Sequence, residues 1–322
     1  MQAFDHLTKE IARKLRCIPA MPTIFLNNGL SLTDAPIDFG QQKNLIEFLI
    51  NGKVDGILAD GTTGEAATQD HQEQIGFIRY TVKAVNGLVP VIAGCGSNCT
   101  YETIRLTKGA IEVGANAVLL VKPYYNKPGA AGLLAHYSKI AELGFPFITY
   151  SVSSRHGGGP IPIEVIAKLA EMFPHHVGHK EAEGKLQRFI QLRKSCPDDF
   201  VIWSGDDGMT ARAMAEGYCD GVISVAANVV PDMVKMMVEF FVTEDCIQQV
   251  RGYTVESRLQ KLFSNEGLFI QTNPQPVKTA LELMGIIRQA CFRLPLVPME
   301  KENPSDIDTL REILKDLDLL PS

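Results

Sequence analysis

The chain has 322 residues, of which 45% are hydrophobic, and its formal net charge is −6 at pH 7. This length is sufficient for one large domain or for a domain with an added segment. The acidic balance argues against a nucleic-acid-binding surface, and no apolar run is long enough to span a bilayer. Residues 1–21 lack the apolar core of a signal peptide, and the seven cysteines show no CxxC spacing. We therefore expect a cytoplasmic protein with reduced cysteines and with neither nucleic-acid nor membrane partners.

Short apolar runs alternate with segments of helical periodicity over the first two thirds of the sequence. The expected strands are residues 18–25, 56–59, 89–93, 117–121, 147–151, 177–180, 200–204 and 221–225. The expected helices between them include residues 42–51, 72–85, 103–113 and 162–173. About eight strand–helix units over ~230 residues are typical of a TIM (β/α)8 barrel, an α/β fold. A doubly wound sheet is the alternative, but the first strand is not followed by a GxGxxG loop.

The strand pattern stops near residue 230. Helical periodicity continues over residues 232–242, 244–263, 276–284 and 305–316, with breaks at Asn273-Pro274 and Leu294-Pro295. We expect a catalytic barrel with a short N-terminal arm over residues 1–230. Residues 231–322 are expected to form a C-terminal helical appendage packed on that barrel.

Unusual polar residues follow several expected strands, at the barrel end where chemistry takes place in this fold. They include residues 61–65 after the second strand, 122–128 after the fourth and 150–156 after the fifth, while Lys180 ends the sixth. A lysine at the end of a buried strand needs a partner or a lowered pKa, and its neutral amine can form a Schiff base with a carbonyl substrate. The alternative for Lys180 taken alone is a side chain that extends to the surface.

Taken together, these residues resemble the dihydrodipicolinate synthase / N-acetylneuraminate lyase family of Schiff-base aldolases and lyases. The resemblance extends from residue 19 to about residue 297. Its motifs, in the family's order, are GTTGE at 61–65, PYYNKP at 123–128, KEA at 180–182, SGDD at 204–207, GVISV at 221–225 and NPQPVK at 273–278.

The resemblance implies a reaction without a cofactor or metal ion, in which Lys180 forms an imine with pyruvate. Tyr150 would act near that nitrogen as general acid and base. Thr62 would connect its hydroxyl to that of Tyr125, which the family takes from a neighbouring subunit. Such sharing implies at least a dimer, and the family is usually a homotetramer built as a dimer of dimers.

The same resemblance implies how the two substrates bind. The hydroxyl of Thr63 and backbone N–H groups of the loop that begins at Gly61 would hold the pyruvate carboxylate. The carbonyl of Ile223 would face the same pocket. Arg155 would bind the carboxylate of the second substrate, the aldehyde, because a guanidinium contacts a carboxylate at two points. Its alternative is a structural ion pair at the barrel rim.

One loop departs from the family's pattern. The usual Tyr-Asn-x-Pro-Ser-Arg-Thr-Gly is replaced here by residues 150–157, so that Ser151, Ser153 and His156 are atypical, and residues 157–159 are three glycines. Glu183, close to the lysine, replaces a smaller residue. These departures leave the identity of the aldehyde open.

An effector site for L-lysine is a further implication of the resemblance. In lysine-inhibited members the effector binds at a subunit interface beside the relay tyrosine, and a carboxylate such as Glu102 would receive its ammonium. Gln74 departs from that pattern. The matching positions are Ala66, Ala67, His71, Asn98, Glu102 and Tyr124.

Two groups of polar residues resemble metal ligands, but ordinary structural roles are simpler. His175, His176 and His179 suggest a metal site by number, but on a regular strand residues 176 and 179 would face opposite sides. Asp206-Asp207 is better explained by helix capping than by Mg²⁺. Trp203, on the seventh strand, is attributed to barrel packing.

The leading hypothesis is therefore a class I synthase, which condenses pyruvate with L-aspartate 4-semialdehyde to 4-hydroxy-tetrahydrodipicolinate in lysine and diaminopimelate biosynthesis. A related pyruvate-dependent aldolase that acts on a sugar-acid or other aldehyde is the enzymatic alternative. A catalytically silent ligand-binding relative is the third, although it would have no need of the complete relay.

Overall fold

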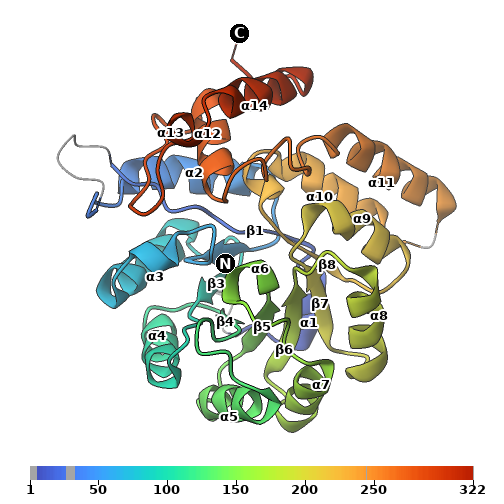
Figure 1. The fold of residues 1–322 in the computed structure, drawn as a ribbon. Helices are drawn as coiled ribbons and strands as arrows, with labels where there is room; N and C mark the ends of the chain where they lie inside the picture. The colour runs from blue at the N-terminus through green and yellow to red at the C-terminus, as the bar shows by residue number, and fades with distance from the viewer. Residues whose placement is uncertain (1–5, 27–32, 244, 322) are drawn as a thin grey trace.

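The computed structural model describes residues 6–26, 33–243 and 245–321. Within them, eight parallel strands pair in the order β1-β8-β7-β6-β5-β4-β3-β2, and a single bridge between Ala20 and Leu58 connects the two edges. Helices surround this nearly closed barrel (Figure 1), which confirms the TIM-barrel prediction. The strands are β1 (Cys17–Pro19), β2 (Ile57–Ala59), β3 (Val91–Gly94), β4 (Ala117–Val121), β5 (Phe147–Ser151), β6 (His176–Glu181), β7 (Val201–Ser204) and β8 (Gly221–Ser224).

The helices lie outside the strands or after them in the chain. Several begin at the residues that capping chemistry favours: Asp70 and Glu73 form a capping box on α3, Asp206 caps α9, and Pro231 opens α10. The helices are α1 (Lys9–Lys14), α2 (Phe39–Asn51), α3 (His71–Val85), α4 (Thr100–Glu112), α5 (Ala130–Ala141), α6 (Ser153–His156), α7 (Ile163–Met172), α8 (Leu186–Ser195), α9 (Asp207–Ala215), α10 (Pro231–Phe240), α11 (Cys246–Leu259), α12 (Gln275–Leu283), α13 (Met299–Glu302) and α14 (Ser305–Asp316), with 3-10 turns η1 (Ala66–Thr68) and η2 (Ala226–Asn228).

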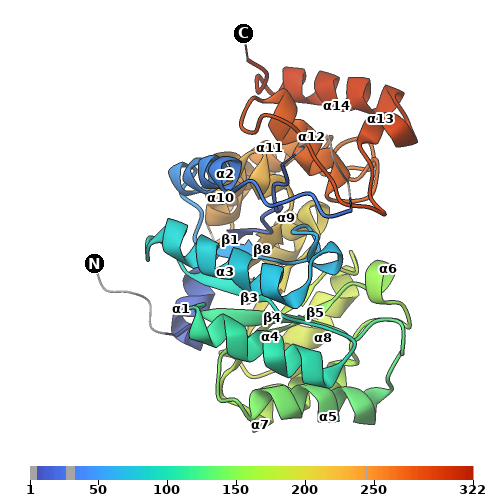
Figure 2. The same cartoon turned by 90° about the vertical axis from the view of Figure 1, so that its left-hand side faces the viewer.

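The barrel interior is filled by alternate residues of the strands, since successive side chains of a strand point to opposite faces. Trp203 lies fully buried there, and its indole N–H donates a 2.7 Å hydrogen bond to the carbonyl of Leu15, just after α1. Helix α1 thus closes one end of the barrel, and Figure 2 shows α6 on the opposite side. The interior cluster includes Ile18, Leu58, Ile92, Leu119, Ile148, Tyr150 and Ile223.

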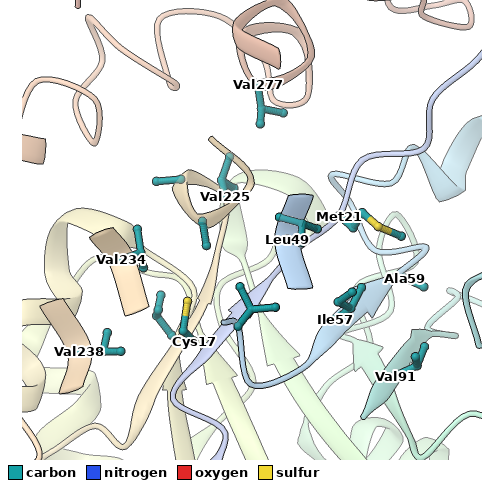
Figure 3. Packing of buried hydrophobic residues seen from close by; sticks show 14 of the residues in the cluster. Cys17, Met21, Leu49, Ile57, Ala59, Val91, Val225, Val234, Val238 and Val277 are labelled. Carbon is teal, nitrogen blue, oxygen red and sulfur yellow. The ribbon is translucent and has the colours of Figure 1, made fainter. Parts of the chain in front are cut away.

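The opposite faces of the strands pack against the helices in a second, larger cluster. Figure 3 shows part of it, with Cys17 and Ile57 from the strands and Leu49 and Val238 from the helices around them. Val277 of α12 belongs to the same cluster, so the C-terminal helices share one core with the barrel.

Most expected elements differ from the observed ones by a few residues at their ends, and two of them differ most. The first strand was expected over residues 18–25, but β1 ends at Pro19. Beyond it only isolated bridges form, because proline at 19 and 22 has no N–H to donate to a strand ladder. The helix expected over 244–263 is α11, which spans Cys246–Leu259, and residue 244 lies outside the described residues. No helix of the described chain is long and apolar enough to cross a membrane.

The predicted arrangement of His176 and His179 is wrong. Both imidazoles contact the hydroxyl of Thr149, His176 through Nε2 at 3.0 Å and His179 through Nδ1 at 2.8 Å, so the two side chains share one face. The register of β6 against β5 shifts between Phe147 and Ile148, which pair with His176 and Gly178. This bulge adds one residue to β6 and brings positions three apart to the same side.

Candidate active site

Lys180 and Tyr150 form a buried pair at the carboxyl ends of neighbouring strands. They lie opposite each other in the register of β5 and β6, and the Nζ of Lys180 is 4.5 Å from the centre of the Tyr150 ring. Only 5% of Lys180 and 7% of Tyr150 is exposed. Burial lowers the pKa of Lys180 to about 8, although the charge of Asp207 opposes this change. The amine is therefore available as a nucleophile near neutral pH, and Lys180 does not extend to the surface.

A glycine provides the space for the Lys180 side chain. A Cβ atom at Gly205, the residue after β7, would lie 2.8 Å from Cε of Lys180 and 2.7 Å from Cβ of Ala182. Any larger residue would displace the lysine. The SGDD motif contains Gly205, but the sequence does not reveal this contact.

The resemblance pairs Thr62 with Tyr125, and in the single chain Thr62 lies beside Tyr150. Burial raises the pKa of Tyr150 to about 12, while the charge of Arg155 and a hydrogen bond with Thr62 act in the opposite direction. The phenol therefore remains protonated over the physiological pH range and can donate a proton to a group bound on Lys180.

Tyr125, the expected end of the relay, lies in the loop after β4 with a positive φ of 66° and 89% of its surface exposed. Among the described residues of a single chain, no hydrogen bond places it beside Thr62. Ile223, by contrast, is fully buried on β8 in the same interior cluster as Tyr150.

The loop after β2 holds Thr63 and is connected to residues far along the chain. Asn273, at the start of the NPQPVK motif, donates a 2.8 Å hydrogen bond from its side-chain amide to the hydroxyl of Thr63. The carbonyl of Asn273 accepts a 2.8 Å hydrogen bond from the guanidinium of Arg155. One residue outside the barrel strands therefore contacts both expected substrate-binding side chains. Sequence reasoning missed this role, because a separation of 210 residues gives no indication of contact.

A buried cluster of charges supports the same loop. Glu65, which has a positive φ of 55°, forms an ion pair with Lys278 of α12, and both side chains are at most 1% exposed. Lys278 also donates to the carbonyl of Cys291 at 2.9 Å. Arg293 binds Glu73 of α3 at 2.6 Å and donates its backbone N–H to Glu65 at 3.3 Å. The C-terminal segment thus neutralises a carboxylate that lies two residues after Thr63 in the same loop.

The atypical residues at the end of β5 and in the loop after it form hydrogen bonds. Ser151 accepts the N–H of Ile161 at 3.0 Å. His156 is 2% exposed; its Nε2 accepts the N–H of Val152 at 2.9 Å, and its Nδ1 contacts the carbonyl of Gly157 at 2.9 Å. This geometry requires a neutral imidazole with its proton on Nδ1, and burial lowers the pKa of His156 accordingly.

Lys122 is a second lysine at the end of a buried strand. It was expected among the polar residues after the fourth strand, but without a role of its own. It follows β4, is 3% exposed, and donates to the carbonyls of Gly158 at 3.1 Å and Gly159 at 2.7 Å. Because Val121 packs against the interior cluster, the next side chain leaves the barrel on its other face, away from Lys180. The sequence pattern that identified Lys180, a lysine directly after an apolar run of strand length, is also present at Lys122.

The residues expected to bind an effector lie on the loops after β2, β3 and β4 and on the helices that follow. Asn98 accepts a 2.8 Å hydrogen bond from Asn126, which connects the second and third of these loops. The carboxylate of Glu102 accepts the hydroxyl of Ser97 at 2.7 Å. Gln74 donates to the carbonyl of Ala66 at 2.8 Å. In the described residues, no hydrogen bond or ion pair joins His71 or Ala67 to Glu102, while Tyr124 is 39% exposed.

The aspartates after β7 serve as backbone acceptors. Asp206 caps α9 by accepting the N–H of Met209 at 3.1 Å, as predicted. Asp207 accepts the N–H groups of Val225 at 3.1 Å and Ala226 at 2.9 Å and so holds the loop after β8. In the part of the chain that the structure describes, no group of three or more His, Cys, Asp or Glu side chains is placed to hold a metal ion.

Comparison with known proteins agrees with this geometry. The sequence profile of the Dihydrodipicolinate synthetase family matches residues 15–316. A 4-hydroxy-tetrahydrodipicolinate synthase of Archaeoglobus fulgidus is 44% identical over 305 residues, 94% of this chain and 98% of the relative.

Solved structures are similar as well. The dihydrodipicolinate synthase of Acinetobacter baumannii, solved in complex with pyruvate, superposes with a TM-score of 0.86 at 35% identity. The superposition covers 95% of this chain and all of that one. The enzyme of Cyanidioschyzon merolae, solved with lysine bound, gives 0.87 at 34% identity over 99% of this chain and all of that one. The chain therefore belongs to the Dihydrodipicolinate synthetase family.

Proposed function

We propose that this chain condenses pyruvate with L-aspartate 4-semialdehyde through a Schiff base on Lys180, as a class I lyase. The observation that supports this most directly is the buried Lys180–Tyr150 pair at the barrel end that carries chemistry in this fold. This environment lowers the pKa of the amine and places it next to a phenol that can exchange protons with it.

In the proposed reaction, the Lys180 amine attacks the ketone carbon of pyruvate, and water leaves to give a protonated imine. Loss of a proton from the pyruvate methyl group gives an enamine, whose carbon attacks the aldehyde carbon of the second substrate. The amino group of that substrate then attacks the imine carbon, closes the ring and releases Lys180. One water is released overall, and the product is 4-hydroxy-tetrahydrodipicolinate.

Tyr150 is the proposed proton donor and acceptor in these steps. Thr62 connects it to the relay that ends at Tyr125 of a neighbouring subunit, and the 89% exposure of Tyr125 in a single chain supports a role across an interface. Thr63 and the backbone at Gly61 hold the pyruvate carboxylate, and the carbonyl of Ile223 faces the same pocket. We infer at least a dimer, and by family resemblance a homotetramer that works in the cytoplasm.

Arg155 is the proposed anchor of the aldehyde carboxylate. Its guanidinium is exposed at the barrel mouth, contacts the Asn273 carbonyl, and lies close enough to Tyr150 for its charge to lower the pKa of that phenol. The carboxylate of the semialdehyde fits a guanidinium at this place.

Borohydride reduction tests the chemistry of Lys180 separately from the choice of aldehyde. Pyruvate with borohydride should modify Lys180 irreversibly, and Lys180→Ala should remain unmodified. Pyruvate consumption should then require the semialdehyde, and Arg155→Ala should raise the KM for that aldehyde at least tenfold, since a charge-assisted pair contributes about 1.5–3 kcal/mol. If borohydride traps pyruvate on Lys180 but pyruvate is not consumed with the semialdehyde, the proposed aldehyde is wrong and the imine chemistry of Lys180 still holds.

A pyruvate-dependent aldolase for a sugar-acid or other aldehyde is the second candidate. The atypical Ser151, Ser153, His156 and Glu183 favour it. Ser153 and His156 lie with Arg155 in α6, Glu183 bonds to Ser153, and Ser151 ends the strand before α6. Turnover of a sugar-acid aldehyde with a higher kcat/KM than that of the semialdehyde would establish this alternative.

We further propose that L-lysine inhibits the enzyme at a site formed by Ala66, Ala67, His71, Asn98, Glu102 and Tyr124. The lysine-bound relative supports this, as does the carboxylate of Glu102, which can accept an ammonium group. Titration calorimetry that detects no binding at millimolar lysine would contradict it.

The division of labour along the chain is also a proposal. Residues 1–230 act as the catalytic barrel, and residues 231–322 form a helical region that holds its loops. The contacts of Asn273, Lys278 and Arg293 with those loops support this division.

A further inference from the structure

The short helix α6, which carries Arg155, rests on a side chain from the loop after β6. The Oε1 atom of Glu183 accepts two hydrogen bonds of 2.7 Å, one from the backbone N–H of Ser153 and one from its hydroxyl. Ser153 is the first residue of α6, and Arg155 lies two positions further. Glu183 itself lies three residues after Lys180, so the support of Arg155 originates beside the reacting amine.

Glu183 is itself held by a hydrogen bond to Glu181, which Arg188 holds in turn. Its backbone N–H donates to the Oε1 of Glu181 at 3.0 Å. The other carboxylate oxygen of Glu181 accepts from Arg188 of α8 at 2.9 Å. Since the Glu181 side chain is fully buried, this chain of bonds fixes the position from which Glu183 reaches α6.

The charge of Glu183 also acts on two other groups of this loop. Its carboxylate raises the pKa of Lys122, which burial lowers, and acts in the same direction on His156. Lys122 binds the carbonyls of Gly158 and Gly159, and His156 binds the N–H of Val152, so both groups hold the loop on either side of Arg155. Glu183 thus places a negative charge beside Lys122, and Glu181 adds a second one near His156.

We propose that Glu183 is a positioning residue for Arg155, and that it determines how tightly the enzyme holds the carboxylate of its aldehyde substrate. Ser153 and Glu183 are both atypical for the family. Because they bond to each other, we interpret them as one functional pair. This inference rests on the proposed role of Arg155. It predicts that loss of the Glu183 hydrogen bonds changes the KM for the aldehyde and does not change the KM for pyruvate.

Two substitutions of Glu183 test the proposal. Glu183→Ala removes the acceptor and should raise the KM for L-aspartate 4-semialdehyde about tenfold, because α6 loses two charge-assisted hydrogen bonds. Glu183→Gln keeps an accepting oxygen of the same shape and should restore the KM to within about threefold of the natural chain. The KM for pyruvate should change in neither. Glu164→Ala, at an exposed glutamate of α7, is the matched control.

Amide hydrogen exchange over residues 152–157 supplies a readout that requires no substrate. Exchange should be faster in Glu183→Ala than in Glu183→Gln or Glu164→Ala. Equal exchange in all three variants would overturn the proposal, and so would an equal rise in the KM for pyruvate. If the natural chain does not consume the semialdehyde, the proposed function fails instead, while the exchange result still decides whether Glu183 holds α6.

Discussion

The side-chain amide of Asn273 donates a 2.8 Å hydrogen bond to the hydroxyl oxygen of Thr63. A threonine hydroxyl that accepts this bond directs its own proton elsewhere, and the pocket is where the proposed pyruvate carboxylate lies. Asn273 therefore sets the direction in which Thr63 donates.

Replacement of Asn273 by alanine should raise the KM for pyruvate about fivefold, which corresponds to one neutral hydrogen bond of about 1 kcal/mol. Asn273→Asp should raise it further, because a carboxylate would accept the Thr63 proton and repel the substrate. Initial rates at saturating aldehyde measure both. The KM for the aldehyde should stay constant, since the backbone carbonyl that holds Arg155 is kept; a larger change in that constant would contradict the assignment.

The rate of imine formation should rise with pH and level off above about 8, because only the neutral Lys180 amine attacks pyruvate. With a pKa of about 8, about one tenth of the amine is neutral at pH 7, compared with about one in three thousand for an ordinary lysine. Borohydride trapping at fixed pyruvate over pH 6 to 9.5 measures this profile. A rate that continues to rise tenfold per pH unit up to pH 9.5 would show that burial does not lower this pKa.

Lys278→Met should reduce the free energy of unfolding by about 3–5 kcal/mol, since it leaves the buried carboxylate of Glu65 without its ion-pair partner. The double variant with Glu65→Gln should recover much of that loss, because no uncompensated charge remains. Urea unfolding of the single and double variants gives the coupling energy. Additive losses would indicate that the pair does not act as a unit.

The free energy of unfolding should fall as the pH decreases from 7 to 5, in part because of His136. Burial lowers its pKa to about 4 in the folded chain, so the unfolded chain, with a pKa near 6.5, binds the proton first. This contribution is complete above about pH 6.5 and amounts to a loss of about 2 kcal/mol at pH 5. His136→Gln should flatten the profile by that amount. His156, His176 and His179 remain in both proteins, so the difference isolates one group.

The fold and the central pair could be predicted because their signals are local. Apolar runs of strand length define β4 and β5 with their observed bounds, and the lysine at the end of β6 is visible in the sequence. The ends of β1 were mispredicted because an apolar run with two prolines still looks like a strand until its hydrogen bonds are counted.

The hydrogen bonds that hold the site residues in place could not be predicted, because they join segments that are distant in the sequence. Nothing in the sequence near Thr63 indicates Asn273, and nothing near Arg155 indicates Glu183. The side-by-side histidines of β6 depend on a bulge, which a period of two residues cannot represent.

The buried pair of Glu65 and Lys278 has a consequence for how such an enzyme can be divided or recombined. A fragment that stops at residue 230 would contain all eight strands and every side chain proposed to touch a substrate. It would also contain a buried carboxylate whose counter-charge had been removed together with α12. The smallest transferable unit of this catalyst therefore extends well beyond its barrel, and a chimera should take Glu65 and Lys278 from the same parent.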